Sequence, residues 1–542
     1  MTDTTRDVPP SAAETVAALE QAWGIDLPLA AGVVEVLFDG RLHRLADLVA
    51  RAGVSREGVK QILNALGADV ESSGREVQLR ADRIDDLRAV LPQPPPPELD
   101  ARLDDVIAAA RADLPPPRRD LDHVPATPET VRRRARWLVE RFHLRGRRLV
   151  VLGDRDLTGL AVAVLEPSAS VTVVDVDDAI LAVIARHAER VGLDVRTWFA
   201  DLRVGLPEGL QASADLAFSD PPYTPEGIAL FAQRGLDGLA RTGWARIGLC
   251  HGTGERQVEL SFQVQRALAR LGLVFETMLP GFNAYEGAEA LGSRSALYLC
   301  RPTKRAWKRS ETHDGRARIY SHGATALEAR SRLPADLAAQ ADAGRDELLV
   351  GDGWGDERAI PIPEYVATLS GAAVGIRKLA AAADGVCIDL TAGFAAHLPR
   401  VLLLGLGQAL TAVVAADEGL ALLEAHEDLY RLIRSGYTLT VRRHNSGIAV
   451  VERRAAERHS PLAAAAAELA HRTGAVAVNA LREALVASSR GSAERLVKNA
   501  ARAIITEAEL PAVAGEARLA ELSLTDLDAA ARVLTRTLES AS

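Results

Sequence analysis

Short apolar runs alternate with amphipathic stretches through the middle of the chain, and this alternation predicts strands of a parallel sheet joined by helices. The runs Arg148 to Gly153 and Val171 to Asp175 predict two strands, and Leu157 to Leu165 predicts the helix between them. Further strands are predicted at Val195 to Phe199 and at Ala214 to Ser219. Repeated strand–helix units of this kind predict an α/β domain of the Rossmann-like type, which binds ligands at the carboxyl ends of its strands.

The motif Asp220-Pro221-Pro222-Tyr223 follows the last of these predicted strands. Two prolines fix φ and remove two N–H donors, so the turn is stiff. A carboxylate and a phenol beside it can accept hydrogen bonds from an amine and orient its lone pair. The pattern is typical of enzymes that hold an amine against an adenosyl-sulfonium donor, and it predicts Asp220 and Tyr223 as catalytic residues. A simple surface turn is the alternative.

Glycine and aspartate stand at the ends of the other predicted strands as well. Asp175 follows Gly153 by about 20 positions, the separation at which a carboxylate in a βαβ unit binds the ribose hydroxyls of a nucleoside. Asp201 follows the next strand. The residues expected to bind the adenosyl co-substrate are therefore Gly153, Asp175, Asp201 and Pro221.

The loop after the first strand is acidic, with the sequence Gly153-Asp154-Arg155-Asp156. Two carboxylates disfavour the pyrophosphate of NAD or FAD, but they favour a cationic substrate, because buried ammonium groups need paired charges. We expect Asp154 and Asp156 to bind a polyamine, with Asp156 also catalytic. Alternatively, Asp154 caps the following helix. Further acids that could anchor distal ammonium groups are Glu226 and Glu286.

The first 91 residues predict a separate domain. The segments Leu45 to Ala50 and Ser55 to Leu66 predict two helices, with Ser55 as the cap of the second. Val70 to Leu79 predicts a two-stranded wing that turns at Ser72-Ser73-Gly74. This order predicts a winged-helix-like domain. Its second helix offers only Arg56 and Lys60 as cations, so we favour dimerisation or a lid role over DNA binding.

Several segments resemble the branched-chain polyamine synthases, the bis(aminopropyl)spermidine synthase family. They are Leu121 to Thr130, Gly153 to Thr158, Asp220 to Thr224, Asn283 to Glu286 and Leu291 to Ser293, within a similarity that covers residues of about 35–302. The resemblance implies a winged-helix-like domain followed by a Rossmann-like, class I methyltransferase-like catalytic domain. It also implies transfer of an aminopropyl group from decarboxylated S-adenosylmethionine to the internal nitrogen of spermidine, which gives a branched product.

By the same resemblance, Asp154 and Asp156 belong to the acidic substrate loop, and Asp220 and Tyr223 border the attacking amine. Arg155 departs from the family pattern, which has an acid in the middle of this loop. A cation there favours a shorter amine or an acceptor that bears a carboxylate. If Arg155 faces the donor, intact S-adenosylmethionine becomes the alternative donor and an aminocarboxypropyl group the unit transferred.

Two other functions are compatible with the motifs. One is an S-adenosylmethionine-dependent amino-group methyltransferase, acting on nucleic acid or a small amine, because Asp-Pro-Pro-Tyr also holds flipped-out bases. The other is a regulator without catalysis that senses an adenosyl ligand and acts through the winged helix. The acidic first loop and the lack of a basic groove argue against the methyltransferase.

The last third of the chain repeats the strand–turn–helix pattern without a second Asp-Pro-Pro-Tyr. Gly385 to Gly393 predicts a strand and turn, His397 to Leu404 a helix and Ala409 to Ala416 a second strand. Tyr437 to Arg442 and Ile448 to Arg453 predict closing strands, so we expect a degenerate Rossmann-like module. The expected organisation is a winged-helix-like domain (1–91), a proline-rich linker and helix (92–120), the catalytic domain (121–304), a connector (305–350), the second α/β module (351–456) and a helical region (457–542).

Composition narrows the partners. The net charge of −9 suits a polycationic substrate and disfavours nucleic acid, and 48% apolar residues are enough for several cores. The three cysteines are far apart, so neither a disulfide framework nor a metal site is expected. The pattern shows no signal segment or membrane span, so we expect a cytoplasmic protein. We also expect it to be a homodimer. The run Arg132-Arg133-Arg134 is expected to form a solvated helix face.

Overall fold

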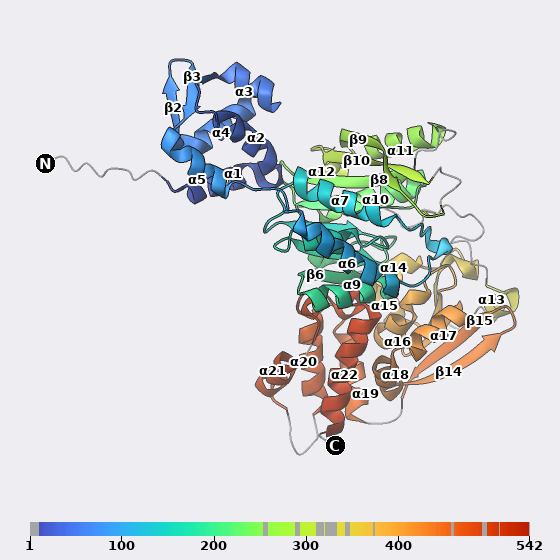
Figure 1. Ribbon diagram of the computed structural model, residues 1–542. Helices are drawn as coiled ribbons and strands as arrows, with labels where there is room; N and C mark the ends of the chain where they lie inside the picture. Colours follow the sequence, from blue (N-terminus) through green and yellow to red (C-terminus); the bar gives the residue numbers. More distant parts are fainter. Residues whose placement is uncertain are drawn as a thin grey trace.

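The computed structural model describes residues 10–252, 258–287, 293–309, 319, 333–341, 347–371, 374–456, 460–489, 496–508 and 510–540. Figure 1 shows an N-terminal domain (blue) set apart from a central α/β domain (cyan to green), with a C-terminal α/β module and helical region (yellow to red) on the other side of the central domain. Most of the expected connector, and Leu291-Gly292 of the family-like segment, lie outside the described residues.

The N-terminal domain has the helices and hairpin that the pattern predicts. Its elements are α1 (Ala12–Trp23), α2 (Leu27–Leu37), β1 (His43–Arg44), α3 (Leu45–Ala52), α4 (Arg56–Leu66), β2 (Val70–Ser73), β3 (Glu76–Leu79) and α5 (Ile84–Val90). The Ser55 hydroxyl accepts from the Gly58 N–H at 3.2 Å and so caps α4 as predicted. The three strands form a sheet in the order β1-β3-β2, and the domain has its own apolar cluster.

The central domain is a seven-stranded sheet covered by helices on both faces. Its helices are α6 (Glu98–Asp113), α7 (Pro128–Arg141), α8 (Thr158–Leu165), α9 (Asp178–Val191), α10 (Pro225–Gly238) and α11 (Val258–Arg270). Its strands are β4 (Arg148–Leu152), β5 (Ser170–Asp175), β6 (Val195–Phe199), β7 (Leu216–Ser219), β8 (Arg246–Gly252), β9 (Leu273–Ala284) and β10 (Arg294–Pro302).

The strand order in this sheet is β6-β5-β4-β7-β8-β10-β9. Strands β6, β5, β4, β7 and β8 are parallel, whereas β10 runs antiparallel to both β8 and β9. The order reverses at β4, so the carboxyl ends of β4 and β7 flank a crevice of the kind in which open α/β sheets bind ligands. The predicted Rossmann-like fold is confirmed.

Helix α8 shows how closely this domain is packed. All eight of its residues are buried, because the helix lies between the sheet and α6–α7. Gly159 allows the approach: a Cβ at this position would lie 2.9 Å from Val173 Cγ2 and 3.0 Å from Asp154 Oδ2. Any larger residue at position 159 would therefore push the helix off β5.

The C-terminal module contains the strands predicted for it and one more. Its sheet has the order β11-β12-β13-β15-β14, with β11 (Glu347–Val350), β12 (Gly385–Asp389), β13 (Ala409–Ala415), β14 (Tyr437–His444) and β15 (Ile448–Ala455). The added strand β11 pairs in parallel with β12, so the last four residues of the expected connector belong to this sheet. The three-residue apolar run Leu348–Val350 was too short for the periodicity to mark as a strand.

Helices surround this second sheet and then form the end of the chain. They are α12 (Ala306–Arg309), α13 (Ala335–Ala341), α14 (Ile362–Thr368), α15 (Val374–Ala382), α16 (Leu398–Leu404), α17 (Ala416–Glu424), α18 (Glu427–Gly436), α19 (Pro461–His471), α20 (Ala477–Ser488), α21 (Lys498–Glu507) and α22 (Leu524–Ser540). The predicted helical character of the last region is confirmed for the part that the structure describes.

The C-terminal region packs against the edge strand β6 of the central sheet (Figure 1). A short turn, Ala512–Gly515, lies beside β6, and Arg196 of β6 pairs with Glu516 at 2.6 Å. The buried Trp198 belongs to one apolar cluster that continues from the central sheet into the C-terminal helices. An exposed edge strand invites pairing with other chains, and here it is covered.

Candidate active site

Four sequence-predicted residues lie at the carboxyl ends of neighbouring strands. Gly153 follows β4, Asp175 ends β5, Asp201 lies two residues beyond β6, and Asp220 follows β7. Since these strands are adjacent in the order β6-β5-β4-β7, their ends share one edge of the sheet. The side chains do not all meet, however. Asp156 and Asp220 are joined through a third residue, whereas Asp201 faces the C-terminal module.

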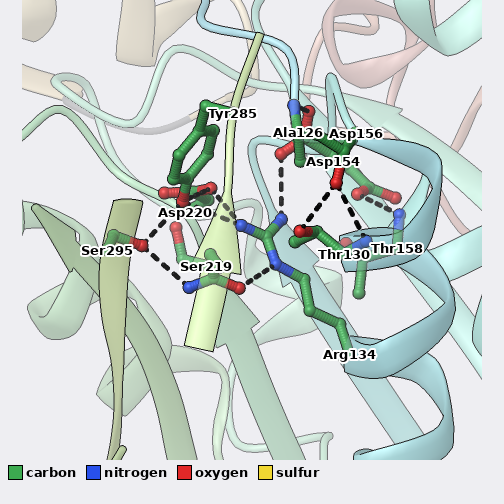
Figure 2. A network of polar contacts seen from close by, with 12 residues as sticks. Ala126, Thr130, Arg134, Asp154, Asp156, Thr158, Ser219, Asp220, Tyr285 and Ser295 are labelled. Atoms are coloured by element: carbon green, nitrogen blue, oxygen red, sulfur yellow. Dashed lines mark hydrogen bonds and ion pairs between the residues drawn. The ribbon is translucent and has the colours of Figure 1, made fainter. Parts of the chain in front are cut away.

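The residue that joins them is Arg134, at the centre of the network in Figure 2. Its Nη1 donates to Asp156 Oδ2 at 2.9 Å, and its Nη2 donates to Asp220 Oδ2 at 2.5 Å. Nη2 also donates to the Tyr285 hydroxyl at 2.9 Å, and Nε donates to Asn283 Oδ1 at 2.7 Å. One guanidinium therefore holds two carboxylates in fixed positions.

The expectation that the arginine run of α7 is solvated is wrong for Arg134. Its side chain is 0% exposed, against 36% for Arg132 and 42% for Arg133. Burial alone would lower the pKa of Arg134, but the surrounding anionic groups raise it well above its ordinary value, so the guanidinium stays charged. The helical spacing of the sequence could have predicted this burial. Arg134 falls in the same stripe as the buried Val131, Ala135 and Leu138.

Tyr285 is a second site residue that the sequence analysis did not single out. Its hydroxyl donates to Asp220 Oδ2 at 2.7 Å and lies 2.8 Å from the Ser295 hydroxyl. The family-like segment Asn283 to Glu286 contains it, but only Glu286 was considered as a substrate anchor. Glu286 instead pairs with Arg111 at 2.9 Å and is half-exposed. The segment thus contributes Tyr285 to the Arg134 network, and the role of Glu286 as an anchor stays a prediction.

Tyr223 lies where the motif predicts, beside the Asp220 carboxylate. Its hydroxyl is 2.9 Å from Asp220 Oδ1 and 2.7 Å from the Tyr285 hydroxyl. Burial, and then the Asp220 charge, raise the pKa of both tyrosines well above the ordinary value. Both phenols therefore stay protonated at neutral pH and can donate to the carboxylate.

The two acids of the first loop have different surroundings. Asp156 accepts from the Ala126 N–H at 2.8 Å as well as from Arg134, and burial raises its pKa. Asp154 is also buried, but its oxygens accept from the backbone N–H groups of Thr158 and Gly159 at 2.7 and 2.8 Å. These groups belong to the first turn of α8. Asp154 therefore makes the helix-capping contacts considered as its alternative role.

Asp175 accepts from the N–H groups of Asp154 and Asp177 at 3.0 and 2.9 Å. Burial raises its pKa to about 6, and the nearby Asp177 adds to the shift. Gly153 precedes the acidic loop with φ at +68°, a conformation that favours glycine, and its N–H donates to the Val174 carbonyl. Pro221 is buried beside Asp220.

The remaining sequence-predicted residues lie outside the Arg134 network. Asp201 is bound by Arg203, whose Nη2 donates to Oδ2 at 2.6 Å. Burial would raise the pKa of Asp201, but Arg203 outweighs it and the pKa lies below its ordinary range. Arg155 Nη2 donates to the Pro115 carbonyl at 2.8 Å, and Glu226 is exposed near the start of α10.

The described residues bear on two other kinds of site. They contain no group of three or more histidines, cysteines or acids arranged to hold a metal ion. Among the helices they include, none combines the length and the apolar character that a membrane crossing requires.

Comparison with known proteins places the site residues in a matched segment. The family model of the branched-chain polyamine synthase A C-terminal domain matches residues 103–323. An N(4)-bis(aminopropyl)spermidine synthase of Thermus thermophilus is 32% identical over 232 residues, which are 40% of this chain and 67% of that protein. One of Thermococcus kodakarensis is 30% identical over 177 residues, 32% of this chain and 50% of that protein.

An uncharacterised protein of Methanocaldococcus jannaschii is 34% identical over 177 residues, 33% of this chain and 44% of its own. The chain thus spans about half the length of most of these curated relatives. A solved branched-chain polyamine synthase of Thermus thermophilus, in complex with N4-aminopropylspermidine and 5'-methylthioadenosine, is 23% identical. The match covers 57% of this chain and 98% of that one, with a TM-score of 0.34.

Proposed function

We propose, because this chain belongs to the branched-chain polyamine synthase family, that it transfers an aminopropyl group from decarboxylated S-adenosylmethionine to an amine of a polyamine. The observation that carries the proposal is the Asp220 carboxylate at the carboxyl end of β7. It is held from one side by Arg134 and from the other by Tyr223 and Tyr285. Such fixed acceptors position an amine without reorganisation during the reaction.

The charge of the cluster suits an amine. One guanidinium, that of Arg134, stands against the two carboxylates of Asp156 and Asp220, so the ionised cluster has a surplus of one negative charge. The Asp220 side chain is 15% exposed, which leaves it reachable from the crevice, whereas Arg134 is not exposed. An amine at this place gains a hydrogen bond to Asp220 in surroundings that exclude most water.

The reaction needs positioning and the removal of one proton. The lone pair of a neutral amine attacks the methylene carbon next to the sulfonium and forms a C–N bond. The C–S bond breaks, and its electron pair neutralises the sulfur, which leaves as the thioether of 5'-methylthioadenosine. The new ammonium then gives a proton to Asp220, which passes it to solvent. Tyr223 forms the wall against which the amine is held.

The donor is proposed to lie at the ends of β4 and β5. Asp175 would accept hydrogen bonds from the ribose hydroxyls, with Gly153 and Pro221 beside the sulfonium end. Asp154 and Asp156, in the loop that follows β4, would face the amine that accepts the aminopropyl group. Glu226 and Glu286 remain proposed anchors for the distal ammonium groups of a longer amine.

The test is incubation of the protein with decarboxylated or intact S-adenosylmethionine and a panel of amines, read by mass spectrometry. We expect spermidine-like acceptors to gain one aminopropyl unit from the decarboxylated donor. Gain of a methyl group would instead identify a methyltransferase, and no product with any acceptor would favour a ligand-sensing regulator. The panel includes shorter amines and amines with a carboxylate, because Arg155 departs from the family loop.

Replacement of the proposed base gives the first mutational prediction. Asp220→Asn should lower turnover by about 100-fold or more, since general-base catalysis contributes about 10²–10⁴-fold. The matched control is Asp85→Asn, on the exposed face of α5 in the N-terminal domain, which should keep full turnover. Turnover of Asp220→Asn within a factor of three of the wild type would overturn the role of Asp220.

We also propose that residues 1–91 form a winged-helix-like domain that serves dimerisation or acts as a lid. The order α3, α4 and the β2–β3 hairpin supports this assignment, and Arg56 and Lys60 are again the cations of α4. Light scattering should give twice the chain mass, and removal of residues 1–91 should yield a monomer if the domain joins the subunits. A labelled DNA duplex should not bind at physiological salt.

A further inference from the structure

The C-terminal module, which lies outside the family-matched segment, is fastened to the carboxyl ends of β5 and β6. Arg203 Nη2 donates to the Gly393 carbonyl at 2.9 Å, and its guanidinium lies 3.9 Å from the centre of the Phe394 ring. Arg400 of α16 is fully buried and donates to Asp178 Oδ1 at 3.0 Å. These contacts bring the loop that follows β12 to the end of the sheet where the donor nucleoside is proposed to bind.

His397, at the end of this loop, has no hydrogen-bond partner for either ring nitrogen although its side chain is only 3% exposed. The ring lies edge-on to Phe199, the last residue of β6, with 5.2 Å between the ring centres. Its Nε2 is 3.8 Å from Asp201 Oδ2, which is too long for a hydrogen bond. Leaving a buried donor and acceptor unpaired is costly, so such a group calls for an occupant that supplies the partners.

A cavity of about 670 Å³ opens beside this histidine. It is lined on the central domain by Ala200 and Asp201, and on the C-terminal side by Val366, His397 and Ala520. The volume falls in the range of small-molecule sites, and the lining mixes apolar walls with a few polar groups, as such sites do. Asp201 lines the cavity, whereas Asp220, Asp175 and Gly153 do not, and the cavity continues along α10 as far as Arg241. Its link to the nucleoside side of the sheet edge is therefore Asp201, which follows β6 and was predicted from the sequence to bind the donor.

We propose that His397 recognises the adenine base of the donor, so that the C-terminal module completes the nucleoside end of the donor site. The inference rests on the proposed function and adds to it a residue from a part of the chain that the family match does not include. A neutral imidazole presents one N–H donor and one acceptor. The 6-amino group of adenine is a donor, and the acceptor nitrogen of the imidazole can accept from it, which makes one hydrogen bond to the base.

Two observations favour His397 over Asp201 for this role. Both oxygens of Asp201 already accept from Arg203, with Nε at 2.9 and 3.1 Å and Nη2 at 2.6 Å. The carboxylate therefore already binds Arg203, which in turn contacts Gly393 of the C-terminal module. Burial also lowers the pKa of His397, which keeps the ring neutral and able to accept as well as donate.

The test compares two nucleosides by calorimetry: 5'-methylthioadenosine and the same nucleoside without the 6-amino group. The wild type should bind the adenine form about tenfold more tightly, the effect of one buried hydrogen bond. His397→Phe should lose this preference, whereas His397→Gln, which keeps a donor and an acceptor, should retain part of it. His444→Phe is the matched control, since His444 contacts Asp336 and Ser446 at the far end of β14 and does not line the cavity.

The outcomes separate this inference from the proposed function. If the wild type transfers aminopropyl groups but His397→Phe discriminates between the nucleosides as the wild type does, the role of His397 is wrong and the function stands. If the wild type neither binds either nucleoside nor forms an aminopropylated product, both are wrong. The melting temperature of each variant shows whether it is folded; if His397→Phe is not, His397→Leu takes its place.

Discussion

Arg134 holds the acids of the site together from inside the protein. A guanidinium without solvent contact is tolerated only when it is paired, and Arg134 has Asp156 and Asp220 as ionic partners. Removing one member of such a set leaves the others buried and uncompensated. The same residue thus sets the position of the proposed base and contributes to the stability of the domain.

The first prediction at the residue scale concerns the contribution of Arg134 to stability. Arg134→Leu should lower the free energy of unfolding by about 3–5 kcal/mol, because two buried carboxylates lose their partner. The neighbouring Arg133→Leu should cost about 1 kcal/mol or less, since this half-exposed side chain belongs to the surface. Urea denaturation measures both values. Equal losses for the two variants would contradict the buried role.

Asp175 gives a prediction about pH. Its pKa in the folded protein is about 6, above the unfolded value of about 3.9, so the folded state binds more protons between these values. The contribution of Asp175 to stability therefore falls as pH rises from about 4 to about 6. Asp175→Asn has no such titration, so relative to the wild type it should gain about 2–3 kcal/mol of unfolding free energy between pH 4 and pH 7.

Urea denaturation of both proteins at several pH values checks this. The free energy of unfolding of Asp175→Asn also differs from that of the wild type by an amount that does not change with pH. This difference arises because an amide oxygen replaces only one of the two carboxylate oxygens that accept from Asp154 and Asp177. Only the change of the difference with pH is informative. Parallel pH profiles for the two proteins would show that the pKa of Asp175 is not raised.

At the scale of elements, the first turn of α8 depends on Asp154. Leu157, the residue before the helix, has φ at +64° and makes no side-chain cap. The Asp154 carboxylate takes that place by accepting from Thr158 and Gly159. The acid that the loop pattern assigned to substrate binding thus fixes the helix that carries the loop.

We predict that Asp154→Ala lowers the free energy of unfolding by about 1–2 kcal/mol, the usual cost of losing a helix cap. Thermal and urea unfolding measure this loss. A role confined to substrate binding would raise the KM for the amine and leave stability unchanged. The variant Asp156→Ala serves as the comparison for the effect on α8. Its loss of stability would come from the contacts with Arg134 and Ala126, because Asp156 does not bind the first turn of α8.

At the scale of the whole molecule, the apolar clusters show which parts depend on one another. The N-terminal domain has a cluster of its own, from Ala12 to Leu91. A single cluster instead runs from the central sheet through the C-terminal module to Leu538. The C-terminal module is thus part of the core that supports the central domain.

Two shortened chains test this dependence. A chain without residues 1–91 should remain folded, because the N-terminal domain has a separate apolar cluster. The central domain loses the packing of Ile25, the hydrogen bond from the His143 N–H to the Ile25 carbonyl, and the ion pair of Arg246 with Asp26, but Arg246 keeps Glu276 as a partner. A chain that ends at Arg309 should aggregate, because it exposes the apolar side of β6 and of α10. Soluble yield and circular dichroism give the result. A soluble, folded chain ending at Arg309 would contradict the shared core.

Local patterns along the chain were sufficient for much of this protein. Short apolar runs followed by glycine or aspartate predicted the strands β4 to β7. The Asp-Pro-Pro-Tyr motif marked Asp220 and Tyr223, which the structure places side by side. Hydrophobic periodicity and turn-forming residues suffice here, because a strand and the turn that ends it are adjacent in sequence. The roles of the predicted site residues, the homodimer and the absence of a metal stay predictions.

The partners of these residues depended on contacts between distant segments. Arg134 meets Asp220 across 86 positions and Tyr285 across 151, and Arg400 meets Asp178 across 222. No periodicity reports which buried charge will face which acid, because that depends on how helices and sheets pack. Packing turned an apparently solvated arginine into the centre of the site, and it placed the C-terminal module at the end of the sheet where the donor is proposed to bind.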